Sequence, residues 1–139
     1  MSGKLKKPMF DNEHDRLVST KEGRDQCVAE IKRIASLYPG AAVQLHEFTG
    51  PREIGLDLTY GPFFCAMYFD GSDHAGAFIG HWYMNRARDD ESAKTYPDTF
   101  WRVGSFNTFH KQKATTIENT FAGFLAKLEE GLELLSAYT

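Results

Sequence analysis

The stretch IGLDLTYGPFFCAMYFD, residues 54–70, decides the fold class because it holds two strands separated by a turn signal. Its first half alternates apolar residues with small or polar ones, and the apolar positions are Ile54, Leu56, Leu58 and Tyr60. A two-residue period of this kind is typical of a strand with one buried face. Gly61 and Pro62 then allow a break, and the apolar run FFCAMYF predicts a second strand. The two strands are therefore expected to belong to an antiparallel meander.

Three further segments have strand character. AAVQLHEF, residues 41–48, precedes the pair, and the turn signal DGSD leads from the pair into AGAFIGHWYMN, residues 75–85. After the polar and charged segment RARDDESAKTYPD, residues 86–98, strand character returns in FWRVGSFNTF, residues 100–109. A loop as long as this polar segment is unusual in a compact domain, which indicates that it is mobile or functional. The sequence thus predicts about five strands in a largely antiparallel sheet.

Amphipathic helices are predicted on both sides of the strands. The first should cover about Lys21 to Leu37, and its apolar stripe at the 3.6-residue period is Cys27, Val28, Ile31, Ile34, Ala35 and Tyr38. The second lies in TTIENTFAGFLAKLEEGLELLSAY, residues 115–138, and its stripe is Ile117, Phe121, Phe124, Leu125, Leu128, Leu132 and Leu135. Capping-box spacing marks the expected start of each helix, in the pairs Ser19 with Glu22 and Thr115 with Glu118.

The order of these elements is helix, about five strands, helix. This order favours an α+β fold in which both helices cover one face of the antiparallel sheet. The chain has 139 residues, which suits a single domain with one core. Because the first 18 residues contain few apolar side chains, we expect a flexible N-terminal arm at 1–18 and one α+β domain at 19–139.

Composition indicates an ordinary globular protein. Hydrophobic residues make up 42% of the chain and charged residues 25%, and the formal net charge is -3. The negative charge disfavours nucleic-acid binding through bulk positive charge, although a local basic patch stays compatible with it. No apolar run is long enough to span a membrane, and the N-terminal lysines are not followed by the apolar segment of a signal peptide. We therefore expect a cytoplasmic protein in which Cys27 and Cys65 are buried thiols.

Both alternating positions of the central strands are apolar, which raises the question of what covers the second face of the sheet. If two helices cover one face, the other exposes an aromatic surface, and soluble monomers rarely leave a large apolar patch uncovered. We predict an interaction face that binds a second copy or another protein through Phe64, Tyr68, Phe78, Trp82 and Met84. The alternative, left open here, is that the sheet or the N-terminal arm covers these side chains within one chain.

The sequence contains few indications of catalysis. His74 and His81 are seven residues apart, so in a regular strand they point to opposite faces and do not bind one metal ion. Zinc, calcium and phosphate-loop spacings are absent from the sequence, and we expect no cofactor and no metal site. An enzyme that pairs Cys65 with His46 or His81 stays a third reading, because catalytic pairs need not be neighbours in sequence.

A short basic cluster lies in FNTFHKQKATT, residues 106–116. It holds His110, Lys111 and Lys113 just before the predicted start of the last helix, where free N–H groups and the helix dipole favour an anion. This arrangement suggests binding of a nucleic acid or another polyanion, and the simpler alternative is a solvated loop. The leading hypothesis is nonetheless a small non-catalytic protein-binding domain, which acts through its aromatic sheet face as a homodimer, a subunit or an inhibitor.

Overall fold

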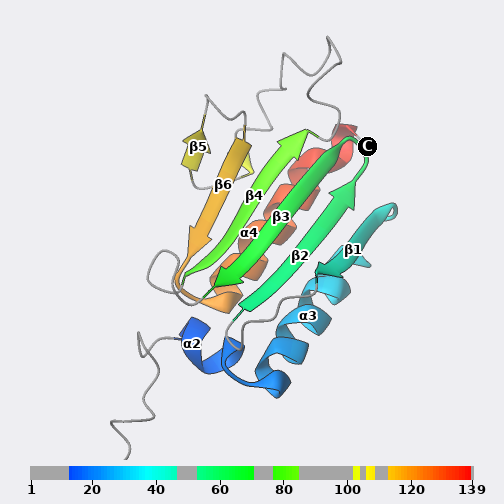
Figure 1. Ribbon diagram of the computed structural model, residues 1–139. Helices are drawn as coiled ribbons and strands as arrows, with labels where there is room; N and C mark the ends of the chain where they lie inside the picture. Colours follow the sequence, from blue (N-terminus) through cyan, green and yellow to red (C-terminus); the bar gives the residue numbers. More distant parts are fainter. Residues whose placement is uncertain are drawn as a thin grey trace, which may run out of the picture.

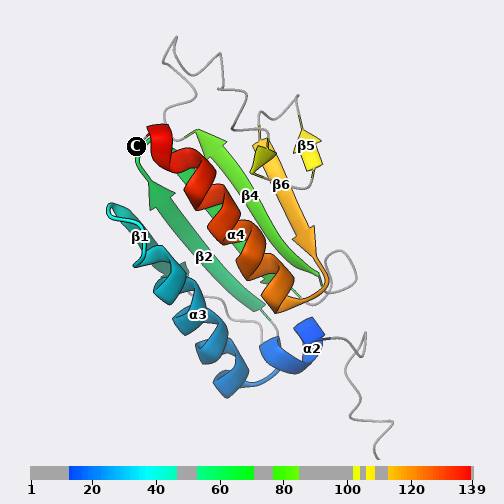
Figure 2. The same cartoon turned by 180° about the vertical axis from the view of Figure 1, so that it is seen from behind.

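The computed structural model describes residues 13–46, 53–70, 77–84, 102–103, 106–108 and 113–138. Within them the chain forms one antiparallel sheet with the strand order β1-β2-β3-β4-β6-β5. The strands are β1 (Ala41–His46), β2 (Glu53–Tyr60), β3 (Phe63–Asp70), β4 (Phe78–Met84), β5 (Phe106–Thr108) and β6 (Lys113–Glu118). The helices are α2 (Glu13–Val18), α3 (Lys21–Ala35), α4 (Phe121–Leu135) and the 3-10 turn η5 (Ser136–Tyr138). Figure 2 shows α3 and α4 in front of the sheet, and Figure 1 shows its opposite face.

This arrangement confirms the predicted α+β class, with both main helices on one face of an antiparallel sheet. The hairpin between β2 and β3 is the one expected from its turn signal, since Tyr60 pairs with Phe63 across a two-residue connection. Gly61 has φ 58°, a left-handed conformation that glycine adopts without strain. Four strands therefore follow one another in space in their chain order, and only β5 and β6 depart from it.

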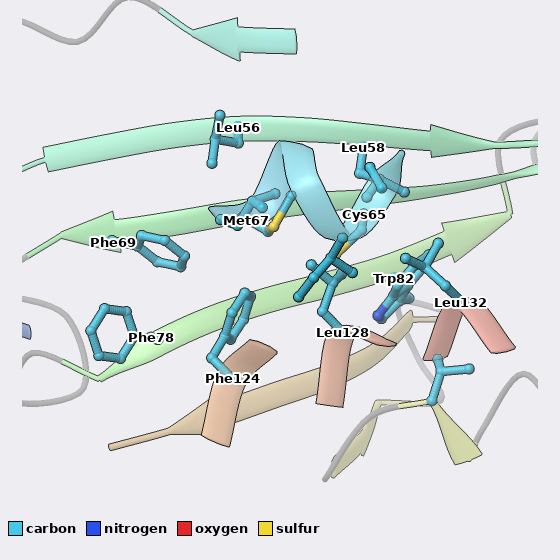
Figure 3. Packing of buried hydrophobic residues seen from close by; sticks show 14 of the residues in the cluster. Leu56, Leu58, Cys65, Met67, Phe69, Phe78, Trp82, Phe124, Leu128 and Leu132 are labelled. Atoms are coloured by element: carbon cyan, nitrogen blue, oxygen red, sulfur yellow. The ribbon is translucent and has the colours of Figure 1, made fainter. Parts of the chain in front are cut away.

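The core lies between the sheet and the two helices. Buried side chains of β2, β3 and β4 lie in one cluster with Phe124, Leu128 and Leu132 of α4, as Figure 3 shows. At one end the rings of Phe69, Phe78 and Phe124 pack edge to face or tilted, with centroids 5.1–6.5 Å apart. At the other end Trp82 lies against the backbone of Gly131. The two pairs that include Phe124 add to the free energy of burial that holds α4 on the sheet.

A tyrosine links the two helices to each other. The hydroxyl of Tyr38, which follows α3, lies 3.4 Å from the Glu129 carbonyl and 3.3 Å from the Glu133 carboxylate on α4. Its ring packs edge to face on Tyr60 of β2 at 6.0 Å. Burial raises the pKa of the Tyr38 hydroxyl, and the nearby charge of Glu133 raises it further. The hydroxyl therefore remains a neutral donor over the physiological range.

The N-terminal segment differs from the expected flexible arm. Residues 13–18 form the short helix α2, and Val18 at its end is fully buried in the core. The Arg24 guanidinium donates to the Val18 carbonyl at 2.8 Å, which satisfies a carbonyl that the short helix leaves without a partner. The ordered domain therefore begins before residue 19, while residues 1–12 lie outside the described part of the chain.

The helix starts also differ from the predicted capping boxes. Thr20 caps α3 and Thr120 caps α4, and each threonine hydroxyl accepts the backbone N–H of a glycine three residues later, Gly23 or Gly123, at 3.0 Å. A threonine followed three residues later by glycine thus marks both starts. The correction for α4 is large, because the helix begins at Phe121 rather than near Thr115.

Residues 113–118 form strand β6, although the last helix was expected to start near Thr115. Its side chains alternate, since Ala114 and Thr116 are buried under the helices and Ile117 belongs to the opposite face beside Ile79. The run of β-branched residues from Thr115 to Ile117 favours a strand over a helix. The sheet thus gains a strand at this position, and the predicted strand at 100–109 is described only at Arg102–Val103 and in β5.

Candidate functional site

The pairing register of the strands determines which side chains share a face. Cys65 pairs with Trp82, and both side chains face α4, whereas their neighbours Phe64 and Tyr83 pair with each other on the opposite side. We call this opposite side the open face. Its residues on β2, β3, β4 and β6 are Gly55, Asp57, Thr59, Phe64, Ala66, Tyr68, Ile79, His81, Tyr83, Thr115 and Ile117.

Two members of the predicted interaction face are core residues instead. Phe78 is fully buried, and Trp82 is 1% exposed beneath α4. Both belong to the helix-covered face. Along β4 they alternate with the residues that pair with Phe64 and Tyr68, and so they point to the other side of the sheet. Met84 is the last residue of β4, and its side chain lies outside the described part of the chain. Of the predicted set, Phe64 and Tyr68 remain on the open face.

The exposed part of the open face is aromatic. Phe64 and Tyr83 stack across β3 and β4 with ring centroids 5.6 Å apart and planes 28° from parallel. Both side chains are half-buried, and Tyr68, four residues along β3 from Phe64, is 40% exposed. Burial raises the pKa of the Tyr83 hydroxyl, and the neighbouring Tyr68 raises it further, so this hydroxyl stays protonated. The three rings present apolar area together with the hydroxyl groups of the two tyrosines.

The centre of the open face is already covered within one chain. Ile79 is 1% exposed, and Ala66 and Thr115 are each 6% exposed, although all three belong to the side away from the helices. Cover within one chain, one of the two alternatives that the sequence left open, therefore applies to the centre of the face. The centre is closed, and the strip formed by Phe64, Tyr83 and Tyr68 is accessible.

Polar groups border this strip. The Nδ1 atom of His81 lies 3.0 Å from the Thr115 hydroxyl, and the direction of this hydrogen bond depends on the tautomer of the ring. Asp57 belongs to the same cross-strand row, on the other side of Ala66. Aromatic rings next to a small number of hydrogen-bonding groups are the usual composition of a protein-binding surface.

Comparisons with protein-family models, with curated protein sequences and with solved structures found no match for this chain. The function must therefore be argued from the open face and from the other residues singled out above.

Lys113, the described member of the predicted anion-binding cluster, is not at a helix N-terminus. Lys113 is the first residue of β6, and a whole strand separates it from the start of α4 at Phe121. His110 and Lys111 lie outside the described residues. The helix dipole, which motivated the prediction, acts within the first turn of a helix and thus does not reach Lys113.

Neither a metal site nor a membrane span is found in the part of the chain that the structure describes. No group of three or more His, Cys, Asp or Glu side chains is arranged to hold a metal ion there. None of the described helices is both long enough and apolar enough to cross a membrane. His74, which the sequence paired with His81 as a weak candidate, lies outside the described residues.

The cysteine pairing that would support an enzyme does not form with His81. Cys65 faces the helices, while His81 belongs to the open face on the other side of the sheet. Cys27 and Cys65 are both buried, and neither forms a disulfide. Burial raises the pKa of the Cys65 thiol far above its ordinary value of 9.0, and the charge of Asp57 adds to the shift. The reactive thiolate is therefore suppressed in the folded protein.

We expect the thiols to be protected from a disulfide reagent at pH 8 until the protein unfolds. The raised pKa of the Cys65 thiol also makes the free energy of unfolding depend on pH. Below pH 9.0 the Cys65 thiol is protonated in both states, and above it the unfolded chain ionises first, so stability falls as pH rises further. Absorbance assays with and without urea measure the reaction, and a Thr59→Cys variant, exposed on β2, is the reactive control. Fast labelling of native Cys65 would contradict the burial described here.

Proposed function

We propose that this protein is a small non-catalytic binding domain that recognises another protein through the aromatic strip Phe64, Tyr83 and Tyr68 of the open face. The observation that carries the proposal is the 40% exposure of Tyr68 beside a stacked aromatic pair, on the sheet face that α3 and α4 leave uncovered. Tyrosine is enriched among the residues that dominate binding energies, because it offers a large rigid ring and a hydroxyl group.

The surroundings of the strip support a protein partner. The strip lies along β3 and β4, with the half-buried His81 and Asp57 at its border. Exposed aromatic side chains with polar groups at their rim are typical of protein interfaces. Both cysteines are buried and neither forms a disulfide, which suits action in the reducing cytoplasm, and we include that location in the proposal.

A site-specific photo-crosslinker tests the proposed surface. With p-benzoylphenylalanine in place of Tyr68, we expect ultraviolet light in the cell of origin to join the protein to one or a few specific partners. The same group in place of Ala126, exposed on α4, should give no such product. Equal products from both positions, or none from position 68, would show that the strip is not the binding surface.

Binding by point variants gives the energetic test once the partner is known. We expect Tyr68→Ser to raise the dissociation constant at least about tenfold, because the ring would lie at the centre of the contact. Leu37→Ser is the matched control, since Leu37 is an exposed apolar side chain, 57% exposed, that follows α3 on the helix side. Isothermal titration calorimetry measures both, and equal effects of the two variants would reject the assignment of the strip.

A further inference from the structure

We infer that two copies of this chain associate through strand β1, which pairs with its own symmetry mate and joins two sheets into one. This surface is the edge of the sheet and is separate from the aromatic strip. β1 pairs with β2 on one side, and no described element lies beyond it on the other side in either view (Figures 1 and 2). Among the described residues, the backbone groups on that side have no strand partner.

The two edge strands of the sheet differ in the features that usually prevent an edge strand from pairing with another chain. β5, at the far edge, has three residues, and short edge strands offer little to a second chain. β1 has six residues, AAVQLH, with no lysine, no proline and a one-to-one register to β2 that contains no bulge. Charge, proline and bulges are the usual devices against pairing. β1 is thus the unprotected edge.

The side chains of β1 also leave apolar area uncovered. Leu45 belongs to the helix side of the sheet, opposite Leu56, yet it is 51% exposed. Leu56 itself is fully buried by the helices, and Val43, two residues earlier on β1, is half-buried. A strand added outside β1 would cover Leu45 in the way that β1 covers the edge of β2.

Symmetry makes a second copy the partner that fits. A two-fold axis that relates two antiparallel edge strands stands perpendicular to the sheet, so both copies keep their helices on the same side. Helix-side residues must then pair with helix-side residues. The register centred on Gln44 satisfies this condition and places Leu45 opposite Val43 of the second copy, twice. A centre at Val43 would give Leu45 only Ala41 to contact, which is a smaller side chain.

The absence of charged side chains at residues 41–45 is compatible with the same pairing. A copy of β1 placed against itself therefore meets no like-charge repulsion. At the centre, the amides of the two Gln44 side chains can each donate and accept a hydrogen bond. Because one strand pair is a small contact, the dimer should be in a concentration-dependent equilibrium with the monomer.

The register provides a sharp test, because the two Gln44 side chains would be directly opposite. We expect sedimentation velocity to show wild-type dimers at high protein concentration. Gln44→Lys and Gln44→Glu should each raise the dimer dissociation constant about tenfold by placing like charges together, and an equal mixture of the two should restore a dimer. Ala126→Lys, on the exposed side of α4, should dimerise as the wild type does, and circular dichroism checks that each variant is folded.

Two results of this experiment would count against the inference. A wild-type protein that stays monomeric at every concentration, or a dimer that Gln44→Lys leaves unchanged, would overturn the inference. The experiments also distinguish a failure of the dimer inference from a failure of the proposed function. Tyr68→Ser should leave the dimer intact, and Gln44→Lys should leave the partner cross-linked at position 68 unchanged.

Discussion

Replacing Trp82 with alanine is expected to lower the free energy of unfolding by about 3–5 kcal/mol, the cost of removing a large buried aromatic side chain. Trp82 is 1% exposed, and its ring lies between β4 and α4 against the backbone of Gly131 (Figure 3). The cavity that the substitution leaves is bordered by a strand and a helix backbone, which do not easily collapse into it. Urea unfolding followed by far-ultraviolet circular dichroism measures the change.

Tyr83→Ala is the matched control, because Tyr83 is the next residue of β4 on the open face. It is half-buried and stacked on Phe64, so we expect a loss of only about 1 kcal/mol. The comparison also separates a core residue from a binding residue. If Trp82→Ala kept its stability but lost a partner, the original assignment of Trp82 to an interaction face would be right and the register described here would be wrong.

The Gly23→Ala variant is expected to lose about 2–3 kcal/mol of stability, although alanine is the better helix former. A methyl group at Gly23 would overlap the backbone carbonyl of Leu17 at the end of α2. Because a backbone carbonyl cannot turn aside as a side chain can, α2 would have to move away from α3. Val18, which is fully buried, would then lose its contacts with the core. Urea unfolding measures the stability, and limited proteolysis at Arg16 reports the release of α2.

Gly123→Ala is an unusually close control for this variant. Gly123 is also the third residue of its helix and also donates its N–H to a threonine cap at 3.0 Å. A methyl group there would meet only side-chain oxygens of Glu118 and Thr120, at 2.9 Å. The Glu118 carboxylate can rotate away, but the Thr120 hydroxyl must shift and so weaken its cap on the helix, and we therefore expect a smaller loss, of about 1 kcal/mol. Equal losses in both variants would show that the cap, and not the approach of α2, makes glycine necessary.

Local patterns were sufficient to predict the class of the fold. The two-residue alternation in β2, the turn at Gly61 and Pro62, and the apolar stripes of α3 and α4 each follow from a short-range rule, and each element is present. Periodicity also placed Phe121, Phe124 and Leu128 in the core. Such rules work because the side-chain period of an element is a property of its own backbone.

The composition of the open face could not be predicted in the same way. Each strand has two faces, and the choice between them depends on how β3 and β4 are paired, which is a relation between segments. In β3 and β4 the residues on both faces are apolar, as with Phe64 beside Cys65 and Tyr83 beside Trp82. Hydrophobicity then does not indicate which face is turned toward the helices. Phe64 and Tyr68 were assigned to the correct face, whereas Phe78 and Trp82 were assigned to the wrong one. The sequence signal that was missed is Asp57, the charged residue that marks the water-facing parity of β2.

The start of α4 was misplaced for a related reason. Thr115 and Glu118 have the spacing of a capping box, but the same spacing also occurs in strands that contain threonine and glutamate. Thr120 followed by Gly123 was the true start, and the β-branched run from Thr115 to Ile117 was the available signal against an earlier one. With that start corrected, Lys113 moves from a helix end to a strand.

The position of α4 over the middle of the sheet has a consequence for how the protein is made. Phe69, Phe78 and Trp82 all depend on α4 for their cover, and α4 is synthesised after every strand of the sheet. Until α4 has left the ribosome, the nascent sheet therefore exposes its largest rings to water and to other nascent chains. We expect the meander to remain a substrate for chaperones throughout translation, and to become a folded domain only when its last helix arrives.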